Sequence, residues 1–177
     1  MAIPSKYQWL YTIGQLPKMV TSFLAIYGTK EVPGAGNNPV IMSWAKQLGL
    51  KDYTADSIPW CGLAMAWMAT QAGYPNEVAN PLWAKNWKSF GVLVKIPMLG
   101  DVLTFTRESG GHVGIYIAED KDCYHVGGGN QSDDVTITRI LKSRLYSASM
   151  PKFKIGAPAS RKQYFVSASG EISKNEA

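Results

Sequence analysis

The sequence has few charged residues, few cysteines and no long apolar stretch. Charged residues make up 18% of its 177 positions and hydrophobic residues 46%, which excludes a disordered chain. Two cysteines cannot form a disulfide scaffold, and no Cys/His cluster has zinc-finger spacing. The longest uninterrupted apolar run, Leu63 to Ala69, is far shorter than the ~20 residues that cross a bilayer. The first residues lack the pattern of a secretory signal, so we expect synthesis in a cytoplasm without a signal peptide.

The net charge of +5 is concentrated in the last third of the chain. Residues 121–177 hold nine of the 18 basic residues but only five of the 13 acidic ones. A mildly basic surface attracts polyanions such as nucleic acids or cell-envelope polymers, although an ordinary solvated face has the same composition. There is no basic block, RNP-like motif or interleaving of aromatic and basic residues, so we expect no nucleic-acid partner.

Several stretches in the first half of the chain favour helices. Apolar residues recur at helical spacing through residues 7–28, and Pro17 is expected to split this stretch in two. Asn38-Pro39 and Asn80-Pro81 each combine a capping asparagine with a proline suited to the first helical position. Each pair therefore predicts the start of a short helix.

The middle of the chain predicts a buried helix, and the second half predicts a sheet. Residues 60–73 are apolar on all sides, which is typical of a central helix, and Cys61 would lie at its N-terminus. After this segment the pattern changes to short β-rich runs, at 102–106, 113–118, 123–126 and 135–140. Helices followed by strands predict an α+β fold, with an antiparallel meander packed on the central helix. We expect a single domain over residues 1–156 and a partly frayed tail over 157–177.

Two cysteines and two histidines limit the nucleophile–base pairs that this chain can form. A thiol at a helix N-terminus lies at the positive end of the helix dipole, which favours the thiolate, and the free N–H groups there could form an oxyanion hole. Cys61 has this predicted position, whereas Cys123 lies in a predicted strand and is expected to be inert. The alternative for Cys61 is a small buried side chain without reactivity, because free cysteines are commonly buried.

His112 is the favoured general base, because it begins a predicted strand between glycines that leave its ring accessible. A third polar side chain should orient the imidazole and fix its tautomer. The candidates are His125, Asn130, Gln131 and Asp133. Regular strand alternation would put His125 and Asn130 on opposite faces of the sheet, but the nearby glycines can introduce a bulge, so alternation does not choose between them.

Four motifs, taken together and in order, resemble those of a known group of enzymes. They are Lys30-Glu31-Val32-Pro33-Gly34 with Asn38-Pro39-Val40-Ile41, then Asp56-Ser57-Ile58-Pro59-Trp60-Cys61-Gly62, then Gly100-Asp101-Val102 with Gly111-His112-Val113-Gly114, and then Gly128-Gly129-Asn130-Gln131-Ser132. In these motifs the chain resembles papain-like peptidoglycan hydrolases of the CHAP and NlpC group, and more narrowly a subfamily of single-domain bacterial and phage proteins. The resemblance covers about residues 5–147. It departs from the usual pattern at Ser57, where an acidic residue is more common, although Asp56 is adjacent.

The resemblance implies a papain-like fold and a Cys–His thiol mechanism. Cys61 would be the nucleophile and His112 the general base. Asn130 is the preferred third member, and His125 is the alternative because NlpC-type members use a second histidine. Trp60, Gly62 and Gln131 are assigned to substrate binding. Core packing is the favoured role for Trp83 and Trp87.

The resemblance further implies an enzyme, such as a phage endolysin, that is made in a bacterial cytoplasm and cuts an amide bond in the cell wall. The enzyme would be either an N-acetylmuramoyl-L-alanine amidase or a peptide endopeptidase, and the sequence does not decide which bond is cut. One alternative is an interbacterial amidase toxin, whose partner would be an immunity protein. The other is a catalytically inactive wall-binding or virion module of the same fold. We expect peptidoglycan as the partner, a monomer, no membrane span, no metal and no cofactor.

Overall fold

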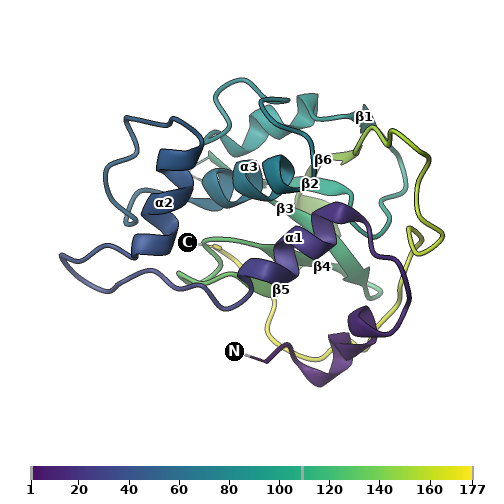
Figure 1. The fold of residues 1–177 in the computed structure, drawn as a ribbon. Helices are drawn as coiled ribbons and strands as arrows, with labels where there is room; N and C mark the ends of the chain where they lie inside the picture. Colours follow the sequence, from purple (N-terminus) through teal and green to yellow (C-terminus); the bar gives the residue numbers. More distant parts are fainter. Residues whose placement is uncertain (1, 109, 177) are drawn as a thin grey trace.

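The computed structural model describes residues 2–108 and 110–176, and it shows an α+β fold in which helices pack against an antiparallel sheet (Figure 1). The predicted coarse class is therefore confirmed. The helical segments are η1 (Ser5–Tyr11), α1 (Lys18–Ile26), α2 (Pro39–Gln47), α3 (Cys61–Gln71), η2 (Ala84–Ser89) and η3 (Lys142–Arg144), where η marks a 3₁₀ helix. The strands are β1 (Val92–Leu93), β2 (Val102–Arg107), β3 (Gly110–Glu119), β4 (Cys123–Gly128), β5 (Thr136–Leu141) and β6 (Leu145–Met150).

The sheet has the strand order β1-β6-β2-β3-β4-β5, and every neighbouring pair is antiparallel. The meander from β2 to β5 is the one that the sequence predicts. Strand β6 then crosses back to pair with β2 on the other side, and the short β1 completes that edge. Neither β1 nor β6 was expected, because β1 has only two residues and β6 carries polar side chains at several positions.

Prolines and an asparagine set the helix boundaries near the N-terminus. The expected break at Pro17 is confirmed, since Pro17 directly precedes α1, although the segment before it is a 3₁₀ helix. Asn38 caps α2 as predicted, with its side-chain oxygen accepting the Val40 N–H at 2.7 Å. The helix expected to start at Pro81 starts instead at Ala84, as the 3₁₀ helix η2, because the chain turns at Asn80 with a positive φ of 49°.

Helix α3 is the centre of the larger hydrophobic core. Every residue from Cys61 to Ala69 except Trp67 is buried, so the predicted central helix is confirmed. Its neighbours in this core come from α1, α2 and the middle strands of the sheet. Figure 1 shows α3 lying across the sheet between α2 and α1. A smaller apolar cluster that includes Phe105 and Tyr116 is formed by the sheet strands themselves.

Close approach of the sheet to α3 requires glycine at the end of β4. A Cβ atom on Gly129 would lie 2.6 Å from the Cβ of Ala64 and equally close to the ring of Trp60. Real Cβ atoms essentially never approach that closely, so only glycine lets the chain pass the helix here. This passage leads the chain directly into Asn130 and Gln131.

Asp56 joins the two loops that precede α2 and α3. Its side chain is buried, and its Oδ2 accepts the backbone N–H groups of Val32 at 3.0 Å and Asn38 at 2.7 Å. The Asn37 side chain in turn accepts the N–H of Asp56 at 2.9 Å. The carboxylate therefore fixes the loop from which Cys61 emerges. This gives a structural reason for an acidic residue shortly before Pro59.

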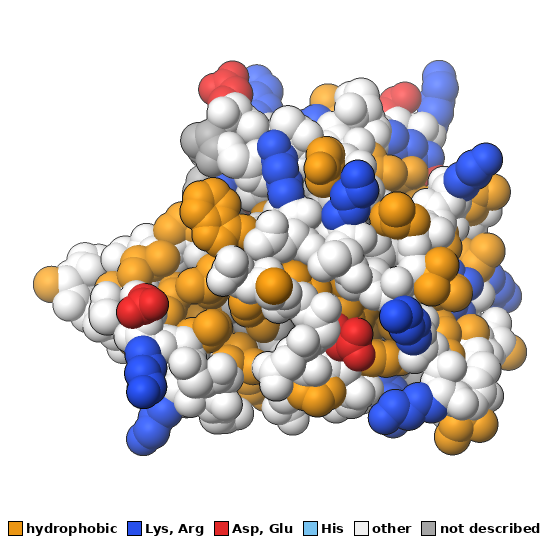
Figure 2. Space-filling view, turned by 90° about the horizontal axis from the view of Figure 1, so that it is seen from above, with side chains coloured by type: hydrophobic (Ala, Val, Ile, Leu, Met, Phe, Trp, Pro, Cys, Tyr) orange, Lys and Arg blue, Asp and Glu red, His pale blue; other side chains and the backbone are white. Residues whose placement is uncertain are grey.

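The surface carries interspersed charges. Figure 2 shows one face, on which lysine and arginine side chains are more frequent than aspartate and glutamate and are spread over the face without forming one patch. None of the helices among the described residues has the length and apolar character needed to cross a membrane.

Replacing Asp56 should loosen the region before α3. We expect Asp56→Ala to lower the free energy of unfolding by about 2–4 kcal/mol, because it leaves buried backbone N–H groups without an acceptor. Urea denaturation measures this, with the exposed Asp52→Ala as the matched control. Equal stability of the two variants would contradict the assigned role of Asp56.

Candidate active site

Trp60 anchors the N-terminal end of α3. Its ring is fully buried and packs against Trp44, with the ring centroids 6.2 Å apart. Its indole N–H donates to Glu31 Oε2 at 3.1 Å. The ring therefore has no surface to offer a substrate, and the expected role of Trp60 in substrate binding is replaced by a structural one.

Cys61 is the first residue of α3, and its thiol lies among backbone N–H groups. The N–H groups of Val113, Gly62 and Cys61 itself interact with the sulfur, and the positive charge of Arg107 acts on it as well. Burial nevertheless dominates and raises the pKa of the thiol, since the residue is only 4% exposed. The helix N-terminus is therefore placed to stabilise a thiolate, but the closed site holds a neutral thiol.

His112 directly precedes Val113 in β3, the residue whose N–H faces the Cys61 sulfur. The imidazole is fully buried on β3, and its Nε2 lies 3.1 Å from Gln131 Oε1. Its Nδ1 has no hydrogen-bond partner among the described residues. Burial lowers the pKa of His112 to about 4, while the negative charge of Glu176 acts in the opposite direction.

Gln131, and not Asn130, holds the His112 ring. The Gln131 amide nitrogen donates to Val126 O at 3.2 Å and to Thr136 O at 2.7 Å, so the amide oxygen is the atom left for His112. The structure therefore places Gln131, one position after the preferred Asn130, against the imidazole, and because Gln131 is only 2% exposed it offers little surface for its expected substrate contact. The reason is local: Asn130 adopts a positive φ of 56°, which ends the strand alternation before residue 131.

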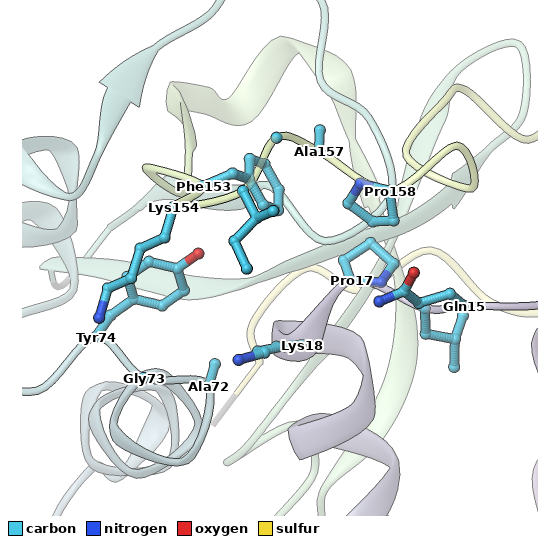
Figure 3. A pocket seen from close by; sticks show the side chains of 13 residues that line it. Gln15, Pro17, Lys18, Ala72, Gly73, Tyr74, Phe153, Lys154, Ala157 and Pro158 are labelled. Carbon is cyan, nitrogen blue, oxygen red and sulfur yellow. The ribbon is translucent and has the colours of Figure 1, made fainter.

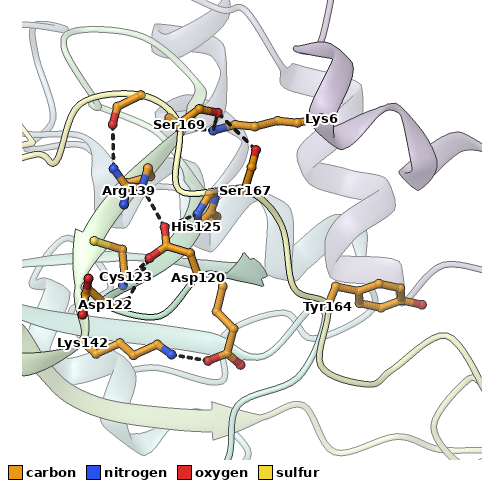
Figure 4. Close-up of polar contacts among 12 residues, drawn as sticks. Lys6, Asp120, Asp122, Cys123, His125, Arg139, Lys142, Tyr164, Ser167 and Ser169 are labelled. Atoms are coloured by element: carbon orange, nitrogen blue, oxygen red, sulfur yellow. Dashed lines mark hydrogen bonds and ion pairs between the residues drawn. The ribbon is translucent and has the colours of Figure 1, made fainter.

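His125 belongs to a separate buried network, shown in Figure 4. Its Nε2 lies 2.8 Å from Asp120 Oδ2, and its Nδ1 lies 2.6 Å from the hydroxyl of Tyr7. Arg139 Nε donates to the same carboxylate oxygen at 2.8 Å. These charges hold the pKa of Asp120 well below its usual range, although burial alone would raise it. With both ring nitrogens engaged there, His125 is not the partner of His112.

Gly62 and the tryptophans that follow it pack in different ways. A Cβ on Gly62 would lie 2.3 Å from the carbonyl oxygen of Pro81, so glycine is needed where that loop crosses the start of α3. Trp87 is buried in the core as expected, and its indole N–H donates to Pro81 O at 2.9 Å. Trp83 differs from the expectation: it is 72% exposed and lines a cavity of about 250 Å³ together with Tyr53.

Three charged residues near the two catalytic candidates were not found from the sequence. Glu176 and Arg144 both influence the pKa of His112, and Arg107 influences His112 and Cys61. Glu176 is almost completely buried, in a segment that was expected to be frayed. Arg144 lies in Lys142-Ser143-Arg144-Leu145, a stretch that also fits the resemblance, but the sequence offers no signal for Glu176 beside it.

Another cavity, of about 340 Å³, lies at the opposite end of α3 (Figure 3). Its lining includes Tyr74 just after the helix and Phe153 and Lys154 from the region after β6. Since an 11-residue helix is about 16 Å long, this cavity is remote from Cys61. Both cysteines are free, and the described residues contain no group of three or more His, Cys, Asp or Glu side chains that could hold a metal ion.

Comparisons with protein-family models, with curated proteins and with solved structures found no match for this chain. The placement of Cys61, His112 and Gln131 in the fold is therefore the main support for a functional proposal.

The buried His112 should make the fold sensitive to acid. Its pKa is lower in the folded state than the ordinary value of 6.5, so its contribution to stability is present above pH 6.5 and is lost as the pH falls towards 4. We expect wild type to lose about 2 kcal/mol more free energy of unfolding than His112→Asn between pH 7.5 and 4.5. Urea titrations at the two pH values measure the difference, and equal losses would contradict the assigned environment of His112.

Proposed function

We propose that this chain is a cysteine hydrolase that cuts an amide bond in peptidoglycan, with Cys61 as nucleophile, His112 as general base and Gln131 as the residue that orients the base. The observation that carries the proposal is the placement of the thiol. The Cys61 thiol lies at the N-terminus of a buried helix and against the N–H of Val113 on β3. Val113 follows the buried His112, whose Nδ1 has no hydrogen-bond partner among the described residues. This is the arrangement expected of a papain-like fold.

Gln131 selects the tautomer that the reaction needs. Because its amide oxygen faces His112 Nε2, that nitrogen carries the ring proton and donates it in a hydrogen bond. The Nδ1 lone pair is then free to accept the proton of the Cys61 thiol. A neutral amide orients the ring in this way without competing for the proton.

The reaction then follows thiol chemistry with no further group required. The thiol proton passes to His112 Nδ1, and the sulfur attacks the carbonyl carbon of the amide. The N–H groups at the start of α3 stabilise the negative oxygen of the intermediate. The nitrogen of the broken C–N bond takes the proton from His112 and leaves as an amine. Water, deprotonated by His112, then hydrolyses the thioester and releases the acid with a free Cys61.

Peptidoglycan is favoured as the substrate by the four motifs that the chain shares with wall hydrolases. In this structure those motifs perform linked tasks around one site. Asp56 fixes the loop before Cys61, and Gly129 lets the chain that carries Gln131 pass close to α3. The exposed ring of Trp83, near the loop that crosses Gly62, offers an aromatic surface to a sugar or peptide chain.

One observation favours a second candidate, the catalytically inactive module of the same fold. Cys61 is 4% exposed, so no substrate carbonyl reaches the sulfur in this conformation. The inactive module requires a Cys61 that stays unreactive in every state of the protein. Labelling with iodoacetamide at neutral pH distinguishes the two candidates, with Cys61→Ser as the control for labelling elsewhere.

Removing the thiol should abolish hydrolysis. We expect Cys61→Ala to release no fragments from purified peptidoglycan, because the remaining thiol, Cys123, lies outside the site. Cys123→Ala is the matched control, since it removes the other buried thiol outside the site and should retain activity. Mass spectrometry of the fragments also identifies the bond cut. Equal lysis by wild type and Cys61→Ala would contradict the proposed mechanism.

Neighbouring residues 130 and 131 should respond very differently to substitution. Gln131→Ala should lower kcat by about a hundredfold, because the ring loses its orientation and tautomer. Asn130→Gly, which keeps the positive φ without strain, should remain near wild type. Steady-state assays on a soluble wall fragment measure both, after unfolding curves show that each variant is folded. A larger loss of kcat in Asn130→Gly than in Gln131→Ala would indicate that Asn130, and not Gln131, orients His112.

A further inference from the structure

Residues 170–176 form an exposed segment whose last described residue is buried beside the site. Residues 170–172, 174 and 175 are exposed and Ser173 is half-buried, whereas Glu176 is only 1% exposed. A segment that is solvated along its length and buried at one carboxylate is held by that carboxylate and by a few backbone contacts.

The backbone contacts guide this segment along β5 towards the site. Arg139 Nη1 donates to Gly170 O at 2.6 Å, and the Ser173 N–H donates to Arg139 O at 2.9 Å. The N–H of Ser132 then donates to the carbonyl oxygen of Glu176 at 2.9 Å. Ser132 follows Gln131, the residue that holds His112, so Glu176 lies at the rim of the candidate active site.

Apolar packing contributes little to holding the segment down. Ile172 is 40% exposed, and a cavity of about 1280 Å³ is lined by residues 169–175 on one side and by Tyr7 and β5 residues such as Ile137 on the other. Figure 4 shows the start of this segment crossing above Arg139 and His125. Lifting the segment away would break polar contacts, among them those of Arg144 Nη1 with Ser173 O at 3.1 Å and of Arg107 Nη1 with Asn175 Oδ1 at 3.2 Å.

The carboxylate of Glu176 is bound by the guanidinium group of Arg144. Two parallel contacts join them, at 2.8 Å from Nη1 and 2.9 Å from Nη2. Arg144 Nε donates at the same time to Thr106 O at 3.1 Å, so β2 holds the guanidinium in place independently of Glu176. A planar, pre-positioned guanidinium is a good receptor for a carboxylate, and it is not specific to the chain that carries the carboxylate.

This ion pair is close enough to the catalytic candidates to act on them. Burial alone would raise the pKa of Glu176, but Arg144 and His112 hold that pKa below its usual value. The charge of Glu176 in turn acts on His112, and Arg107, whose Nη1 donates to Asn175 Oδ1 at 3.2 Å, acts on Cys61. The arginine-bound carboxylate therefore lies within the electrostatic environment of the imidazole.

We propose that Arg144 is a subsite for a carboxylate of the acidic substrate peptide, and that Glu176 fills this subsite and closes the site until substrate displaces residues 170–176. The inference rests on the proposed function, because the stem peptides of peptidoglycan carry free carboxylates. Exchange of one carboxylate for another leaves no buried charge without a partner, so opening and substrate binding are coupled. Because the charge of Glu176 acts on His112, the proposed base for Cys61, we expect the same exchange to give reagents and substrate access to Cys61.

The test uses the full chain in a Cys123→Ala background, so that iodoacetamide reports on Cys61 alone. Glu176→Gln removes the charge held by Arg144, and Glu171→Gln removes an exposed charge from the same segment as the matched control. We expect labelling of Cys61 to accelerate about tenfold or more in Glu176→Gln and in Arg144→Ala, and not in Glu171→Gln. Unchanged labelling in both of the first two variants would overturn the closing role.

The kinetics of hydrolysis of an acidic wall peptide distinguish a substrate-binding role of Arg144 from a role in closing the site alone. Glu176→Gln should raise kcat/KM, whereas Arg144→Ala should raise KM about tenfold or more, because its open site has lost the receptor for the substrate carboxylate. Equal KM values in these two variants would overturn the subsite. Faster labelling without hydrolysis by any variant would contradict the proposed function and leave the closing role supported.

Discussion

The hydrogen bond between Gln131 and His112 is the interaction on which the candidate chemistry depends. Two backbone carbonyl groups hold the amide nitrogen of Gln131, so its oxygen must face the imidazole. This assigns the ring proton to Nε2 and leaves Nδ1 as the basic atom. Without that constraint the buried imidazole could carry its proton on either nitrogen, and the Cys61 thiol would have no defined acceptor for its proton.

The position of this pair follows from packing between α3 and the sheet. Helix α3 can approach β3 and β4 only because glycine stands at the contact points, as at Gly129. The same approach buries Cys61 among the N–H groups at the start of the helix. Burial opposes ionisation of the thiol and of the imidazole, so the closed protein holds both groups neutral. Reactivity therefore depends on solvent or substrate reaching the site.

Local patterns predicted the elements of this fold, whereas long-range contacts decided the details of the site. Helical periodicity and β-rich runs identified α3 and the meander, and the helix start identified Cys61. Strand alternation could not choose between His125 and Asn130, because the chain leaves regular strand geometry at Asn130 with a positive φ of 56°, a feature that side-chain pattern does not report. Trp60 was expected to contact substrate because aromatic residues often line grooves, but its ring is buried against Trp44, a residue from helix α2.

The contact between Glu176 and Arg144 was beyond prediction for the same reason. The two residues are 32 positions apart, and Glu176 lies outside the motifs of the chain. Their meeting depends on the path of residues 170–176 along β5, which is set by single backbone hydrogen bonds. Charge composition indicated only that the last third is basic. It did not indicate that one of its arginines binds a carboxylate next to the candidate base.

Measuring the protonation state of His112 is the sharpest test of the proposed Cys61–His112–Gln131 mechanism. Nitrogen-15 NMR of the histidine rings, assigned with His112→Gln, distinguishes the two neutral tautomers and the imidazolium. At pH 7 we expect a neutral His112 with the proton on Nε2 and none on Nδ1. A proton on Nδ1, or an imidazolium at this pH, would contradict the role given to Gln131 and the proton transfer from Cys61.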